Sequence, residues 1–169
     1  KLLYNEEVLN LLSADLTNVV VQKCYEGTTI LVFNHNNKWH ITTRKCIDAN
    51  KSFWIKNQSY EELFLETIKG KFKLHQLNPI LCYNFILIHH MNKNIVNYQN
   101  GTKTYKKLYL YNITIKGTYQ EINGIWEINK VHIPNVEWTE EIKMNDIEDL
   151  KQKLQMINDA DVNDKNIST

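Results

Sequence analysis

The sequence is poor in the residues that break or cross-link a chain. Its 169 residues include only 5 glycines, 2 prolines and 3 cysteines. The cysteines (Cys24, Cys46 and Cys82) are odd in number and show no Cys-x-x-Cys spacing, so neither a disulfide framework nor a zinc site is predicted. We expect free and mostly buried thiols in a reducing compartment.

Long apolar runs are also lacking. The longest candidate covers residues 80–88, which is the length of a strand and well short of the ~20 residues of a membrane span. No signal peptide opens the sequence, so we expect a cytoplasmic protein without a membrane partner. The net charge of +1 gives no preference for nucleic acid, so only local clusters of charge can indicate one.

Helix and strand signals are spread along the whole chain. Asn36-Asn37 predicts a hairpin turn between strands at 28–34 and 38–43, because asparagine tolerates positive φ. Ser59 and Glu62 form a capping-box pattern for a helix that stops at Gly70. The other predicted elements are helices over 5–14 and 145–157 and strands over 17–25, 80–89, 107–116 and 122–131.

This order of elements predicts an α+β fold, with an antiparallel β-sheet core and peripheral helices. Without a linker or an internal repeat, we expect a single domain over 1–169, with a flexible polar tail at 158–169. Trp39 and Trp54 are predicted to anchor the core.

The turn at Glu26-Gly27 is the best candidate for a functional site. A carboxylate and a glycine stand at the mouth of a β-meander, and Arg44 and Lys45 follow shortly after in the sequence. This arrangement suits the phosphate tail of a nucleotide. The alternative is an ordinary turn in which Gly27 supplies positive φ, beside a solvated basic loop.

Two further groups of side chains have a functional and a structural interpretation. Adjacent histidines on a strand point to opposite faces, so His89 and His90 are predicted to be a polar pair at a turn and not metal ligands. Lysines interleaved with tyrosines on a strand can form a stacking surface for single-stranded nucleic acid, or the tyrosines can simply pack. These residues are Lys103, Lys106 and Lys107 with Tyr105, Tyr109 and Tyr111.

Two blocks of the sequence carry a resemblance to a known family. The first runs from Tyr25 to Phe33 and continues with Lys38-Trp39-His40-Ile41-Thr42-Thr43-Arg44-Lys45. The second, Tyr83 to Val96, is an apolar strand that ends in a turn, with His90 where proline is usual. In order and spacing, residues 19–155 resemble the adenylation domain of RNA ligases related to the first phage type, which large DNA viruses also carry.

The resemblance implies a nucleotidyltransferase-like fold, ATP and Mg²⁺ as cofactors, and single-stranded RNA or DNA ends as partners. That family attaches a nucleoside monophosphate to the lysine of a Lys-x-Asp-Gly motif. The resemblance also implies that the nucleotide is bound by Glu26, Gly27, Arg44 and Lys45. Counting back from Gly27, Cys24 occupies the position of the lysine, so Lys23 is the candidate catalytic residue only if a bulge re-aims it.

Two functions therefore follow as hypotheses. The chain is an ATP-dependent RNA or polynucleotide ligase-like domain, or it is a catalytically inactive relative. Such a relative would serve as a nucleic-acid-binding module or as a structural module of a virion or a larger complex, so that a viral member would lie in the host cytoplasm or in the virion. By the resemblance, the family's later motifs, an acidic Glu-Gly strand and a Lys-x-Lys strand, should follow the predicted helix at 145–157, and the sequence reaches Thr169 before either. We therefore expect an incomplete nucleotidyltransferase core, whose oligomeric state the sequence leaves open.

Overall fold

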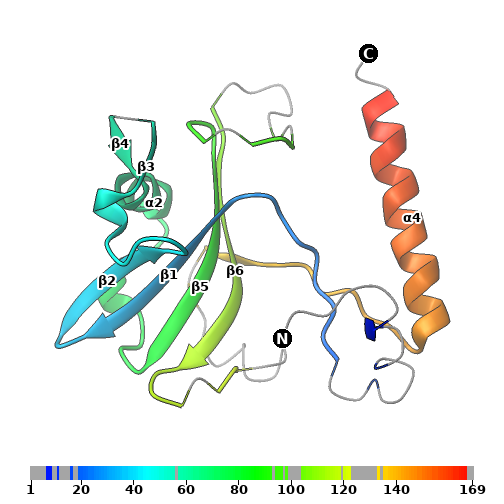
Figure 1. The fold of residues 1–169 in the computed structure, drawn as a ribbon, viewed down its shortest axis with the longest axis horizontal. Coiled ribbons are helices and arrows are strands. Elements are labelled where there is room, and N and C mark those ends of the chain that lie inside the picture. Colours follow the sequence, from blue (N-terminus) through cyan, green and yellow to red (C-terminus); the bar gives the residue numbers. More distant parts are fainter. Residues whose placement is uncertain are drawn as a thin grey trace. The chain divides into compact units, whose positions relative to one another are not determined.

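The chain divides into two compact units (Figure 1). Unit 1 combines Lys1–Lys23 with Glu140–Thr169, and unit 2 is Cys24–Thr139. Unit 2 holds the sheet and therefore most of the predicted elements. The computed structural model describes residues 7, 8, 11, 16, 19–55, 57–92, 94–96, 98, 104–118, 120–122, 133 and 135–166.

Unit 2 is built on a five-stranded sheet with the order β2-β1-β5-β6-β7. The first four strands in this order pair antiparallel, which confirms the predicted α+β class. The predicted antiparallel core is therefore present, and the sheet differs from it at one edge, where the two-residue β7 pairs parallel to β6. The strands are β1 (Thr28–His35), β2 (Lys38–Thr43), β5 (Leu81–His89), β6 (Lys106–Ile115) and β7 (Glu137–Trp138).

The hairpin of β1 and β2 forms where the sequence predicted it. Asn36 and Asn37 both have positive φ, 49° and 60°, as a tight two-residue hairpin turn requires. The register places His35 opposite Lys38. The predicted strands at 80–89 and 107–116 are likewise confirmed as β5 and β6, to within one residue at each end.

Helix α2 (Tyr60–Ile68) begins at the predicted capping box. The Glu62 N–H donates to Ser59 Oγ at 3.2 Å, and the Ser59 N–H donates to Glu62 Oε2 at 2.7 Å. Gly70 follows the helix with a φ of +81°, which favours glycine. Short elements flank this helix along the chain, namely η1 (Ala49–Lys51), β3 (Phe53–Ile55), β4 (Gln58–Ser59) and η2 (Leu74–Gln76).

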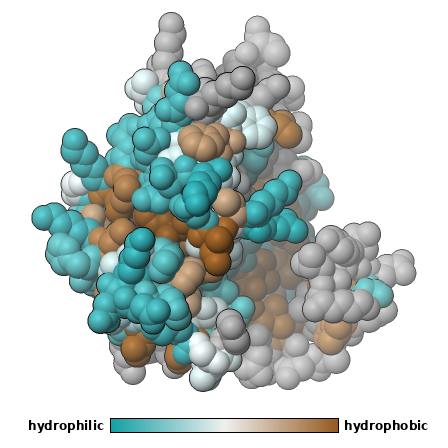
Figure 2. Space-filling view, turned by 60° about the vertical axis from the view of Figure 1, so that its left-hand side comes forward, coloured by the Kyte–Doolittle hydropathy of each residue, from teal (hydrophilic) through white to brown (hydrophobic). Residues whose placement is uncertain are grey.

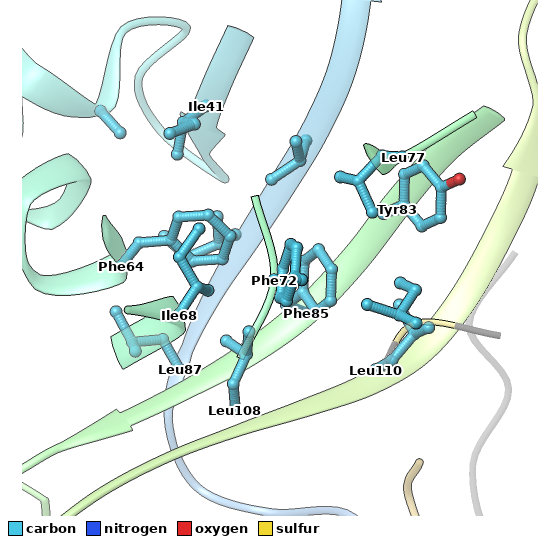
Figure 3. Close-up of a cluster of buried hydrophobic side chains, with 14 of the residues drawn as sticks. Ile41, Phe64, Ile68, Phe72, Leu77, Tyr83, Phe85, Leu87, Leu108 and Leu110 are labelled. Atoms are coloured by element: carbon cyan, nitrogen blue, oxygen red, sulfur yellow. The ribbon is translucent and has the colours of Figure 1, made fainter. Parts of the chain in front are cut away.

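One hydrophobic cluster joins α2 to the sheet (Figure 3). Phe85 of β5 is fully buried. The centroid of its ring lies 5.6 Å from the ring centroid of Phe64 in α2 and 6.2 Å from that of Phe72. Alternate residues of a strand face opposite sides, so the neighbouring Ile86 belongs to a second, smaller cluster with Ile88 and Tyr109. The unbroken apolar run of β5 is therefore explained by burial on both faces.

Unit 1 contains α4 (Ile147–Asn166), which extends well beyond the predicted helix at 145–157 and takes in most of the predicted flexible tail. The strand predicted at 17–25 is wrong for the described residues 19–25, where only Gln22 forms an isolated bridge, to Glu141. The helix predicted at 5–14 and the strand predicted at 122–131 lie mostly outside the described residues. None of the helices in the described part of the chain has the length and apolarity to cross a membrane.

Candidate functional site

A small cavity of about 120 Å³ opens beside the Glu26-Gly27 turn in unit 2. Residues before and at the start of β1 form one part of it, and the loop that follows β5 forms another. Trp54 of β3 and Tyr60 of α2 bring aromatic rings to the same space. The full lining is Glu26, Gly27, Thr28, Trp54, Tyr60, Asn92 and Asn94.

The Glu26 carboxylate accepts hydrogen bonds from the loop after β5 and so holds it in place. The Ile95 N–H donates to Glu26 Oε1 at 2.9 Å, and the Val96 N–H donates to Oε2 at 2.6 Å. The Glu26 backbone is held as well, because its N–H donates to the Tyr98 hydroxyl at 2.9 Å and its carbonyl accepts from that hydroxyl at 3.0 Å. The two backbone N–H groups lower the pKa of Glu26 below its usual value, since they stabilise the carboxylate.

We expect Glu26→Gln to loosen this loop. A glutamine side chain has one acceptor oxygen and no charge, so it can accept only one of the two N–H groups well. The expected result is an upfield shift and faster solvent exchange of the Ile95 or Val96 amide in NMR spectra, with the amides of β5 unchanged. Unchanged amides at both positions would contradict the role of the carboxylate. Glu121→Gln serves as the control, because Glu121 contacts the Asn112 side chain and not this loop.

Gly27 is required by close packing and not by its φ. Among the described glycines, Gly70 and Gly117 have positive φ and Gly27 does not, so the alternative in which Gly27 supplies positive φ is wrong. A Cβ added at Gly27 would lie 2.7 Å from both Ile86 Cγ2 and the Leu87 carbonyl oxygen. The chain can therefore pass this close to β5 only with glycine at position 27.

The aromatic part of the cavity differs from the prediction for tryptophan. Trp39 packs partly buried against the main cluster, as predicted, but Trp54 is 56% exposed. Phe53 beside it is 50% exposed. Figure 2, in which the side carrying β3, β4 and α2 is turned forward, shows hydrophobic residues within a largely hydrophilic surface. Exposed rings at a cavity are available for contact with a ligand.

The predicted phosphate-binding cations are not brought to this cavity. Arg44 and Lys45 are exposed in the turn between Thr43 and Cys46, and neither lines the cavity. Among its described lining residues none is a lysine or arginine. Because β2 pairs antiparallel to β1, with Thr43 opposite Ile30, Arg44 and Lys45 follow β2 at the end of the sheet where β1 begins, but they are not among the residues that line the cavity.

Lys23 belongs to unit 1, whereas the cavity belongs to unit 2. Its Nζ forms an ion pair with Glu140 Oε2 at 2.6 Å. Residues 23–25 lie in no strand, so the bulge that would re-aim Lys23 has no ladder in which to form. Cys24 is exposed, and Cys46 and Cys82 are half-buried, so the thiols are free as predicted but less buried than predicted.

The three lysines predicted to bind nucleic acid differ in what is known of their surroundings. Lys103 lies outside the described residues. Lys106 pairs with Glu66 of α2 at 3.0 Å. The Lys107 Nζ lies 3.4 Å from the Tyr109 hydroxyl.

Sequence reasoning missed Lys71, whose pKa is lowered by burial and by the charges of Lys107 and Lys106, although Glu137 opposes this shift. Its position after α2 gives no such signal along the chain.

The tyrosines predicted as a stacking surface are largely packed. Tyr109 is only 8% exposed, and Tyr25 lies flat on it, with ring centroids 4.1 Å apart. Tyr105 and Tyr111 are partly buried against the same small cluster. The packing interpretation therefore accounts for Tyr109, since a covered ring offers no free face to a base.

His90 lies in the turn, as predicted, but His89 is the last residue of β5, and the two rings do not point to opposite faces. The His89 ring is fully buried, and the two rings stack with centroids 4.4 Å apart. No group of three or more metal-ligating side chains occurs within the described residues. The signal that was available is the position of His89 at the end of a strand buried on both faces.

The residues that line the cavity do not fit a triphosphate with its metal ion. Phosphate oxygens need donors and positive charge, whereas the one charged lining residue that the structure describes is the carboxylate of Glu26. Both oxygens of this carboxylate already accept backbone N–H groups, which leaves little of it for a metal ion.

Comparison with known proteins finds distant viral relatives over part of the chain. No family model matches. An RNA ligase of Rhodothermus phage RM378 is 33% identical over 85 residues, and an immediate-early protein ICP-46 homolog of Invertebrate iridescent virus 3 is 33% identical over 91 residues. These segments are 44% and 50% of this chain, but only 19% and 20% of the two relatives. The similarity links part of the chain to part of a phage RNA ligase and part of a viral immediate-early protein, and goes no further.

Proposed function

We propose that this chain is a catalytically inactive ligase-like module, which binds a nucleoside unit of an RNA or DNA strand in the Glu26 cavity without transferring it to itself. The distant similarity to a phage RNA ligase supports the ligase-like part of the proposal. The composition of the cavity supports the proposed binding of a nucleoside unit. Its described lining has two aromatic rings with amide and hydroxyl groups, and no cation.

The rings favour a nucleobase as the bound group. Base stacking on an aromatic side chain contributes about 1–3 kcal/mol per base, and the Trp54 ring is more than half exposed at the cavity. The side chains of Thr28, Asn92 and Asn94 supply hydroxyl and amide groups for the base edge or the ribose. The volume of about 120 Å³ is far below the ~300–1,000 Å³ of a drug-sized pocket, so it suits one base or one sugar.

The same observations argue against nucleotidyl transfer. Transfer requires an amine nucleophile at the α-phosphate and cations that neutralise the charge developing there. By resemblance the nucleophile position holds Cys24, and Lys23 forms an ion pair with Glu140. In place of a cation the cavity presents the Glu26 carboxylate, whose lowered pKa keeps it charged at neutral pH.

Labelling with nucleotide tests the absence of transfer. The chain is incubated with α-labelled ATP and Mg²⁺ and then denatured. We expect no protein-bound label in the wild type, in Lys23→Ala or in Cys24→Ala. An adduct that is lost in Lys23→Ala but kept in Cys24→Ala would overturn the proposal and restore the active-ligase hypothesis.

Trp54→Ala tests the binding site. We expect it to weaken binding of a single-stranded oligonucleotide at least about five-fold, because one base loses its stacking partner. Phe53→Ala is the matched control: it removes an equally exposed ring from the adjacent position, but Phe53 does not line the cavity. Fluorescence anisotropy with a labelled oligonucleotide measures both. Equal losses in the two variants would contradict a specific role for the cavity.

A further inference from the structure

His89 stands at the point where β5 passes into the loop that shapes the cavity. Its ring is fully buried. The Met91 N–H donates to His89 Nδ1 at 3.2 Å, and the Asn92 N–H donates to the His89 carbonyl at 2.9 Å. The imidazole is therefore part of the turn itself, and it acts there as an acceptor.

Three charged or titratable groups face the imidazole. Glu66 of α2 places Oε2 at 3.7 Å from Nε2, too far for a hydrogen bond. Lys106 of β6 lies opposite His89 in the sheet register and pairs with the same Glu66. His90 stacks on the ring from the adjacent position. In these surroundings Nε2 is buried without a hydrogen-bond partner.

The turn leads directly to the cavity. Asn92 and Asn94 line it, and the next two residues, Ile95 and Val96, donate their N–H groups to Glu26. The described residues of this loop are thus held at Met91 by the imidazole acceptor and at Ile95 and Val96 by the Glu26 carboxylate. Loss of the hydrogen bonds at either end therefore changes the wall of the cavity.

We propose that His89 is a pH-sensitive contact that holds this loop in place, so that acidification releases the described loop residues 91, 92 and 94–96 and weakens ligand binding in the cavity beside Glu26. The release of the loop stands on the geometry of unit 2 alone, and the effect on a ligand rests on the proposed function.

The chemistry follows from the two ring nitrogens. A neutral imidazole that accepts at Nδ1 carries its proton on Nε2, and protonation then adds a hydrogen to Nδ1. That hydrogen points at the Met91 N–H, so two donors face each other and the turn loses its hydrogen bond. Burial is the main reason that the pKa of His89 lies below its usual value, and His90 and Lys106 lower it further while Glu66 opposes them.

The sign of the pH effect is fixed by this shift. The unfolded or opened chain binds the proton more readily than the closed loop, because its histidine keeps the ordinary value of 6.5. The closed state is therefore favoured above that pH and becomes less stable as the pH falls through it. The pKa of Glu26 is lowered from 4.5, so Glu26 keeps its charge throughout this window.

NMR spectroscopy of the whole chain tests the proposal between about pH 7.5 and about pH 5, where histidine is the side chain that titrates. We expect the Ile95 and Val96 amides to shift with the same midpoint as the His89 imidazole. Their solvent exchange, corrected for its intrinsic pH dependence, rises at least about five-fold with the loss of one hydrogen bond. Amides that do not respond while His89 titrates would overturn the proposal.

His89→Asn gives a matched variant, because its amide oxygen can accept from Met91 and does not titrate. We expect its Ile95 and Val96 amides to be independent of pH, whereas His75→Asn, at an exposed position, keeps the wild-type response. Should His89→Asn not fold, the shared midpoint in the wild type still decides the question.

Oligonucleotide binding is measured over the same pH range. A response of the amides without binding at any pH would overturn the proposed function and leave the switch standing. If binding does not change with pH and the Ile95 and Val96 amides do not shift, the pH-sensitive role of His89 is overturned and the proposed function stands.

Discussion

Phe85→Ala is expected to lower the free energy of unfolding of this protein by about 3–5 kcal/mol, the range for truncating a buried aromatic residue. Phe85 has no exposed surface and lies on the central strand β5. Its ring contacts one ring from α2, one from the segment after α2, and the Tyr83 ring 6.3 Å away on its own strand. No neighbouring side chain can fill the resulting space without moving the helix or the strand.

Urea unfolding followed by circular dichroism measures this loss. A domain of this kind is stable by about 5–15 kcal/mol, so the variant should unfold at a much lower urea concentration. Ile80→Ala is the control, since Ile80 lies just before the same strand but is 57% exposed. Such a surface substitution should stay within about 0.5 kcal/mol. Similar losses in both variants would contradict the position of Phe85 in the core.

The parts of the fold that could be predicted from the sequence are those set by local chemistry. The Asn36-Asn37 turn, the Ser59–Glu62 capping box and the apolar run of β5 each depend on residues a few positions apart, and each is confirmed. The β7 strand depends on pairing with β6 across a long stretch of chain, and its two residues carry no pattern of their own. Such pairing is not visible in a local sequence signal.

The candidate site shows the same division. Glu26 and Gly27 were found from the sequence, but their partners are 60 to 70 positions further along the chain, at the end of β5 and in the loop after it. Trp54 was predicted to be in the core because tryptophan is usually buried, whereas a two-stranded hairpin of β3 and β4 leaves it half exposed. Proximity along the chain likewise suggested that Arg44 and Lys45 join the site, but neither lines the cavity, although β2 returns them to the end of the sheet where β1 begins.

His89 is the opposite case, a residue judged ordinary that the structure places in a special position. Its alternation with His90 predicted rings on opposite faces, but the strand ends at His89, so His90 already belongs to the turn. The rings can then stack on each other. The end of a strand is set by tertiary contacts, and it is the boundary that a sequence pattern predicts least well.

Gly27→Ala gives the second large effect and separates two explanations of the same glycine. If Gly27 served only to let a ligand approach, the added methyl group would weaken ligand binding and leave the stability unchanged. The structure instead places this methyl group 2.7 Å from the Leu87 carbonyl oxygen and 3.2 Å from Ile88 Cγ1. The carbonyl belongs to the backbone of β5, which pairs on both sides and cannot move away easily.

We therefore expect Gly27→Ala to destabilise the protein by about 1–3 kcal/mol, the usual cost of overpacking. Cys24→Ala, three positions earlier and exposed, should stay within about 0.5 kcal/mol in the same urea unfolding experiment. A stable Gly27→Ala variant that has lost only oligonucleotide binding would show that the glycine serves the ligand and not the sheet. The expected result is instead a loss of stability that accompanies any loss of binding, because Gly27 positions Glu26 by letting the chain pass close to β5.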